Sequence, residues 1–158
     1  MLNNYLQILQ ESLIKKLEIL NEIEKKSLEQ AKMLKSGEIE FSAIDLNMDE
    51  KAELISELTK LDDGFEHLYE RIREELLKNK EYYKNEILLL KNLISKVTEK
   101  SASIQAIEAR NKAEIEIYCS NQKKGLQSRK TAMSVANDYY QNMNKVKYVS
   151  PQFLDWKK

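Results

Sequence analysis

Glycine, proline, histidine and cysteine are nearly absent from this 158-residue chain, which has three Gly, one Pro, one His and one Cys. With so few turn-forming residues, the sequence gives little support for hairpin turns or sheet bends. A lone cysteine excludes an internal disulfide, which fits a reducing compartment. These shortages favour an all-α protein.

Long hydrophobic runs are also missing. The longest uninterrupted aliphatic run, Ile87–Leu90, is far shorter than the roughly 20 residues that span a bilayer. The first residues, Met1–Tyr5, lack the basic start and apolar core of a signal peptide. The sequence therefore predicts a cytoplasmic protein without membrane insertion.

Residue patterns typical of catalytic or metal sites are scarce. His67 is the only histidine, so the paired Glu-x-x-His motifs of two-iron bundles cannot form, and a surface or boundary position is expected for it. Cys119 has no nearby histidine in the sequence to act as its base. The glycines Gly37, Gly64 and Gly125 are isolated, so no phosphate-binding loop is present; Gly64 either allows two helices to approach closely or softens its helix. We expect no enzyme activity, no metal site and no cofactor.

Apolar residues recur at helical spacing through most of the chain, and 33% of the residues are charged. Leucines and isoleucines between Leu2 and Leu34 predict a first helix over residues 2–35. Ser36–Gly37 ends it, because Gly37 can adopt the left-handed conformation that follows a helix C-terminus.

A second helix is predicted over residues 41–78, with Ser42 or Asn47 as its N-cap and Ser42 favoured because Phe41 is already in register. A turn is expected near Asn79–Glu81, where Asn79 tolerates a left-handed cap. The alternative is a turn near Lys100–Ser101.

A third helix is predicted over residues 82–145. Its heptad seam is apolar from Ile87 to Ile104, becomes polar at Glu108 and Asn111, and recovers from Ala132 onward. We interpret this pattern as an overhang beyond the shorter partner helices. The expected fold is one helical domain over residues 1–146, an antiparallel bundle of about three long helices with the last one longest, followed by a flexible, aromatic tail over residues 147–158.

The charges are unevenly distributed along the chain. Residues 1–100 hold 16 Lys and Arg against 21 Asp and Glu, whereas residues 101–158 hold 10 against 5. A basic cluster lies at residues 123–130 and suits either a solvated helix face or contact with an acidic partner. This excess is weak for a nucleic-acid binder, so no nucleic-acid partner is expected.

Several segments resemble a known family. The restart Glu50–Ile55, the segments Asp63–Tyr69 and Glu108–Lys112, and the C-terminal segments Tyr139–Met143 and Tyr148–Phe153 are similar to those of FlgN-type flagellar export chaperones, especially clostridial members. The resemblance implies a cytoplasmic helical protein that binds the helix-forming terminal segments of hook–filament junction proteins. It would prevent their aggregation and deliver them to the export gate, using its own C-terminal region for cargo.

An apolar stripe left open by the patchy seam suits the capture of a cargo helix. The residues expected to bind the partner are Ile104, Ile107, Ile115, Tyr118, Leu126, Met133, Tyr139, Tyr140, Met143, Tyr148 and Phe153. Tyr148 is also the nearest match to a tail tyrosine that helps some family members dock at the export gate. Two alternatives remain open: a chaperone for the filament cap, and a coiled-coil scaffold or adaptor that self-associates as a homodimer.

Overall fold

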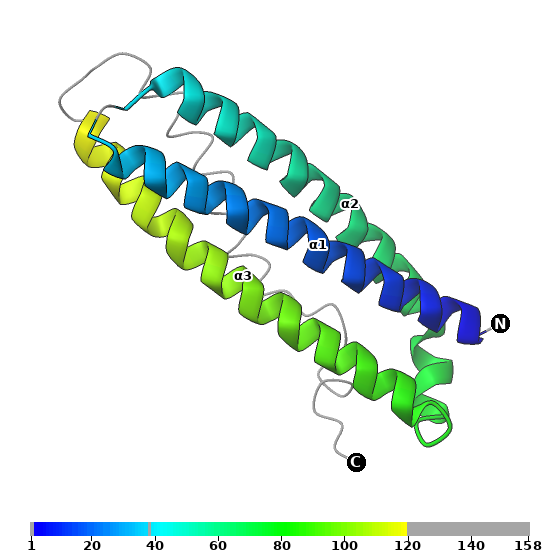
Figure 1. Ribbon diagram of the computed structural model, residues 1–158. Coiled ribbons are helices and arrows are strands. Elements are labelled where there is room, and N and C mark those ends of the chain that lie inside the picture. The colour runs from blue at the N-terminus through cyan, green and yellow to red at the C-terminus, as the bar shows by residue number, and fades with distance from the viewer. Residues whose placement is uncertain (1, 38, 120–158) are drawn as a thin grey trace.

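Three long helices, each antiparallel to the next along the chain, make up the part described by the computed structural model, residues 2–37 and 39–119. They are α1 (Leu2–Lys35), α2 (Phe41–Lys78) and α3 (Lys84–Cys119). Figure 1 shows α1 lying between the other two, with α3 running alongside it in the same direction and α2 in the opposite one. The all-α bundle expected from the sequence is confirmed, and no strand occurs in the described residues.

The core follows the seam of α1, because this helix packs against both of its neighbours. Side-chain contacts between α2 and α3 include Lys51 with Glu108 and Phe41 with Tyr118. Leu20 and Ile23 of α1 are fully buried beside Leu58 of α2 and Val97 of α3. A smaller apolar cluster closes the end of the bundle at which α2 begins, and it consists of Leu34, Ile44, Met48 and Ile115. The central position of α1 explains why its leucines and isoleucines keep a strict helical period.

The connection between α1 and α2 confirms one prediction and corrects another. Gly37 has a φ of 84°, the left-handed conformation expected after a helix C-terminus. The N-cap of α2, however, is Glu40, which makes no side-chain capping hydrogen bond. Ser42 lies inside the first turn, and Asn47 lies further along the helix and donates to the Lys26 carbonyl at 2.9 Å. Both residues proposed from the sequence as N-caps are therefore wrong.

The reversal between α2 and α3 occupies residues 79–83, in the region of the predicted turn. Asn79 does not adopt a left-handed conformation; its φ is −115°. It caps α2 through its side chain instead, with Nδ2 donating to the Glu75 carbonyl at 2.7 Å. The alternative turn at Lys100–Ser101 is excluded, because both residues lie within α3.

The predicted continuation of the last helix to residue 145 and the tail at residues 147–158 lie outside the described residues. Within α3, the polar seam positions do not overhang. Glu108 and Asn111 are 8% and 3% exposed, and Ile115 beyond them is 2% exposed. Over residues 104–115 the seam of α3 therefore packs against the other helices.

Among the described residues, no helix is both long and apolar enough to cross a membrane.

Candidate binding surface

The partner-binding residues predicted on α3 are largely internal. Ile104 is fully buried in the main core, Ile115 belongs to the smaller cluster, and Ile107 is 8% exposed. A partner gains contact area only from side chains that it can reach, and these three are already covered. In this conformation they stabilise the bundle rather than offer a surface.

Tyr118 lies at the end of the bundle where α2 begins. Its ring packs against that of Phe41 with 5.3 Å between the centroids and the planes tilted by 58°. The neighbouring Ile117 is 70% exposed, which makes it one of the most exposed large apolar side chains of the three helices. Leu46 of α2, at the same end, is 61% exposed. Apolar side chains are thus presented at the point where the described chain ends.

The remaining predicted partner-binding residues lie outside the described residues: Leu126, Met133, Tyr139, Tyr140, Met143, Tyr148 and Phe153.

A buried polar layer replaces the open stripe expected on α3. Lys51 of α2 donates through Nζ to Glu108 Oε1 of α3 at 2.7 Å and to Gln30 Oε1 of α1 at 3.1 Å. Asn111 of α3 donates to the same Gln30 oxygen at 3.1 Å and to the Ser27 carbonyl at 2.9 Å. All three helices are joined in one network. The polar seam positions were visible in the sequence, but their partners were not, because Lys51 and Glu108 are 57 residues apart.

The charges in this layer are taken out of water. The side chains of Lys51 and Glu108 are only 5% and 9% exposed. Burial lowers the pKa of Lys51 below its ordinary value, and the Glu108 carboxylate opposes that shift. A buried pair of this kind adds little net stability but penalises any packing that would separate the two charges.

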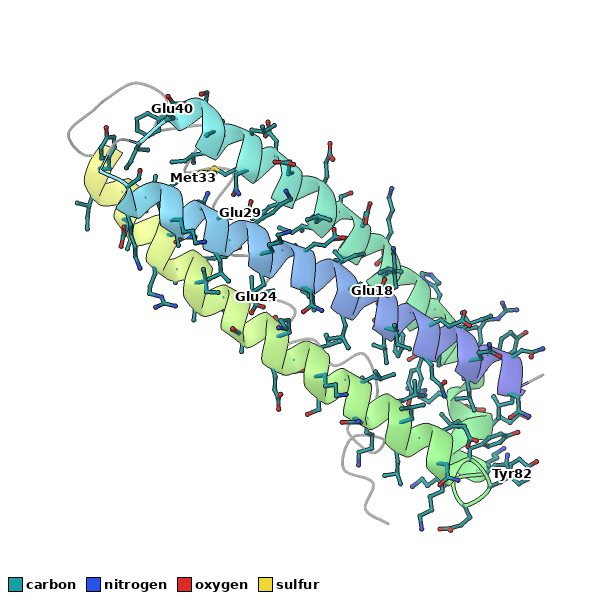
Figure 2. The ribbon with its side chains drawn as sticks, viewed as in Figure 1. Glu18, Glu24, Glu29, Met33, Glu40 and Tyr82 are labelled. Carbon is teal, nitrogen blue, oxygen red and sulfur yellow. The ribbon has the colours of Figure 1, made fainter. Side chains whose placement is uncertain are left out.

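A second buried lysine joins α1 to α2. Lys16 is 2% exposed and forms an ion pair with Asp62, whose side chain is 22% exposed. Burial lowers the pKa of Lys16, and the nearby Asp62 carboxylate acts in the opposite direction. On the other flank of α1, Glu24 accepts from Lys100 of α3 at 2.9 Å and from Ser103 at 3.3 Å; Glu24 is labelled in Figure 2. Both neighbours of α1 are therefore fixed by charged contacts as well as by apolar packing.

A shallow apolar hollow lies between α1 and α2 around Gly64. It has a volume of about 380 Å³, and its lining includes Ile8, Leu61, Phe65 and Leu68. A Cβ atom built on Gly64 meets no atom within 4 Å. The expectation that Gly64 allows two helices to approach closely is therefore wrong. No atom of a neighbouring helix lies close enough to contact a side chain at this position.

His67 is exposed, as expected, and its Nδ1 lies 2.8 Å from the Asp63 carbonyl. No group of three or more His, Cys, Asp or Glu side chains suited to a metal ion occurs in the described ranges. Tyr82 projects from the turn after α2 and is 77% exposed, while its ring meets that of Tyr83 edge-on with centroids 4.7 Å apart (Figure 2).

No protein-family model, curated protein or solved structure matches the chain in the comparisons made.

Proposed function

We propose that this protein is a cytoplasmic flagellar export chaperone of the FlgN type. It binds the helix-forming terminal segments of hook–filament junction proteins, keeps them from aggregating and delivers them to the export gate. Support comes from the segments that resemble this family along most of the chain, from Glu50–Ile55 to Tyr148–Phe153. An all-α bundle with exposed apolar side chains at the end of α3 is compatible with this role.

The observation that carries the proposal is a stripe of apolar residues after α3. Leu126, Met133 and Tyr140 recur every seven residues, so a helix would bring them onto one face. Methionine and tyrosine are suited to such a surface: Met adapts to irregular partners, and Tyr adds contact area with a polar tip. A cargo helix with its own apolar stripe can pack along this face.

The binding energetics follow from the state of the cargo. A disordered terminal segment loses conformational entropy when it becomes helical, so part of the contact energy is spent on ordering. We expect moderate affinity, which suits a chaperone that must release its cargo at the export gate.

Co-purification of the full-length chain with candidate junction proteins tests the proposal. The double variant Met133→Asp/Tyr140→Asp places two charges on the stripe and should abolish capture. Ser134→Asp/Gln141→Asp adds the same charges one position further round the helix and should bind like the parent protein. Equal capture by both variants, or none by the parent protein, contradicts the proposal.

The two alternatives predict different outcomes. A chaperone for the filament cap would retain the cap protein and not the junction proteins. A self-associating scaffold would use its apolar stripe on a second copy. Light scattering at tens of micromolar separates this case, because a monomeric mass excludes self-association as the main use of the stripe.

A further inference from the structure

The side of the bundle opposite α1 is formed by one flank of α2 and one flank of α3. On α2, the α1-facing flank is identified by Asn47 and Glu50, which bond to Lys26 of α1. The opposite flank carries a row of exposed residues at steps of three and four: Asp45, Asp49, Ala52, Ser56, Thr59, Asp63, Glu66 and Glu70. This flank is acidic, with five carboxylates, and its other three side chains are small.

The corresponding flank of α3 carries small residues among longer polar ones such as Lys91, Gln105 and Lys112. Lys100 and Ser103 identify the flank that faces α1, because both contact Glu24. On the other flank the exposed residues include Ser95, Thr98, Ala102 and Ala109. Small side chains allow a further helix to approach the backbone closely, and Figure 1 shows α2 and α3 diverging to either side of α1. A further helix packed on this side of the bundle would contact both flanks.

A buried amide of α1 lies where the three helices meet. Gln30 of α1 is 1% exposed, and its Oε1 lies between Lys51 of α2 and Asn111 of α3. Its Nε2 has no hydrogen-bond partner. A buried amide without an acceptor is costly, so an acceptor is needed where the three helices converge.

The residues after α3 have complementary charge. Residues 120–158 contain eight of the 26 Lys and Arg but only two of the 26 Asp and Glu, a balance of +6. Residues 41–78 contain five Lys and Arg against eleven Asp and Glu, a balance of −6. In the sequence the basic cluster at residues 123–130 begins four residues after α3 ends, and Asp45 and Asp49 lie in the first turns of α2, at the end of the bundle where α3 ends.

The same residues also have the right period and length. Ala132, Ala136, Tyr139, Met143 and Val146 alternate steps of four and three, the seam of a packed helix. A helix over residues 121–146 measures about 39 Å, within the roughly 54 Å of α3. Tyr118 packs against Phe41, so α3 ends beside the start of α2.

We propose that residues 121–146 pack as a fourth helix against the flanks of α2 and α3 opposite α1, with the seam from Ala132 to Val146 facing inward. The acidic flank of α2 binds the basic cluster. The stripe of Leu126, Met133 and Tyr140 lies beside this seam, at the edge that remains for a partner.

Hydrogen exchange of the full-length chain, without any partner, tests the packing. We expect peptides within residues 121–146 to exchange at least tenfold more slowly than an unstructured chain. Ala136→Asp, on the seam, should remove this protection, whereas Ser134→Asp, on the outer face, should retain it. Exchange of the parent segment at the unstructured rate, or equal protection in both variants, overturns the proposal.

A second pair of variants tests the docking surface itself. Glu66→Lys reverses a charge on the proposed docking flank and should reduce protection of residues 121–146. Glu57→Lys makes the same change on the other side of α2 and should leave protection unchanged. Equal effects of the two changes would contradict docking on this flank.

Concentration distinguishes intramolecular from intermolecular packing. Protection that is independent of protein concentration, in a sample that sediments as a monomer, supports the intramolecular helix. Protection that appears only with dimer formation overturns it in favour of a second copy. Because no cargo is present in these measurements, their failure leaves the proposed chaperone function to be judged by co-purification alone.

Discussion

Single polar residues account for the least expected part of this fold. Glu108 and Asn111 interrupt an apolar seam, and the sequence alone suggests that the helix leaves its partners there. In the structure both are buried and bonded, Glu108 to Lys51 and Asn111 to Gln30. A buried polar side chain with a partner fixes the register of the helices that supply the two groups.

The Lys51–Glu108 pair predicts a strong asymmetry between single and double substitutions. Lys51→Ala leaves a carboxylate buried without its partner and should reduce the free energy of unfolding by about 3–5 kcal/mol. Lys51→Met/Glu108→Leu removes both charges and should recover most of that loss. Urea unfolding monitored by circular dichroism measures both changes. Similar losses in the two variants would show that the pair is not buried as described.

The same lysine predicts a dependence of stability on pH. Burial lowers the pKa of Lys51 in the folded protein below 10.5, so between that lowered pKa and 10.5 the unfolded chain binds more protons. This group therefore contributes a rise in stability as the pH increases through that window. The variant Lys51→Met/Glu108→Leu lacks the lysine and therefore this rise in stability. The free energy of unfolding of the parent, minus that of the variant, should therefore increase as the pH becomes alkaline. If this difference in the free energy of unfolding does not change with pH, the lowered pKa of Lys51 is contradicted.

We predict that replacing Gly64 with alanine stabilises the protein. It lies in the middle of α2, and the position of a Cβ atom there is empty to 4 Å. Gly64→Ala removes backbone freedom from the unfolded chain and should raise the free energy of unfolding by about 0.5–1 kcal/mol. Thermal unfolding measures the change. A loss of stability would mean that the hollow beside Ile8 and Phe65 is narrower than the structure shows.

At the scale of elements, the ends of the helices show what short-range sequence signals can and cannot specify. Gly37 was predictable because a residue with positive φ strongly favours glycine. The start of α2 was not, because Ser42 is a good N-cap type but Phe41, one residue earlier, is already helical and packs on Tyr118 of α3. The start of α2 thus follows the contact between Phe41 and Tyr118 rather than the preference of Ser42 for the N-cap position.

The N-cap of α2 leads to a prediction for this element. Glu40 has the extended backbone of an N-cap, with φ −92° and ψ 106°, but makes no side-chain capping bond. Glu40→Ser supplies a hydroxyl that can accept from a free amide of the first turn and should stabilise the protein by about 1 kcal/mol. Glu40→Ala is the matched control, because it removes the carboxylate without adding an acceptor. Equal melting temperatures for the two variants would contradict the assignment of Glu40 as the cap.

At the scale of the whole molecule, the helical type of the described elements followed from the hydrophobic period, whereas their separation relied on the turn signals at Gly37 and Asn79. The periodic leucines of residues 2–35 gave α1 with its observed bounds, since a long amphipathic helix is the strongest pattern a single sequence offers. The packing of α2 and α3 on either side of α1 could not be predicted, because periodicity identifies the apolar face of a helix but not the helix that packs against it. For the same reason Ile104 and Ile115 were predicted as contacts for a partner, although their own chain covers them.

We propose, as the central claim, that a helical bundle presents residues C-terminal to α3 to a helix-forming segment of another protein. Calorimetric titration of the full-length chain with purified terminal segments of hook–filament junction proteins tests this most directly. We expect saturable binding to at least one segment, with a negative heat-capacity change from the burial of apolar surface, and loss of this binding in Met133→Asp/Tyr140→Asp. An absence of binding heat across the temperature range for every junction segment, or unchanged binding by that variant, would contradict it.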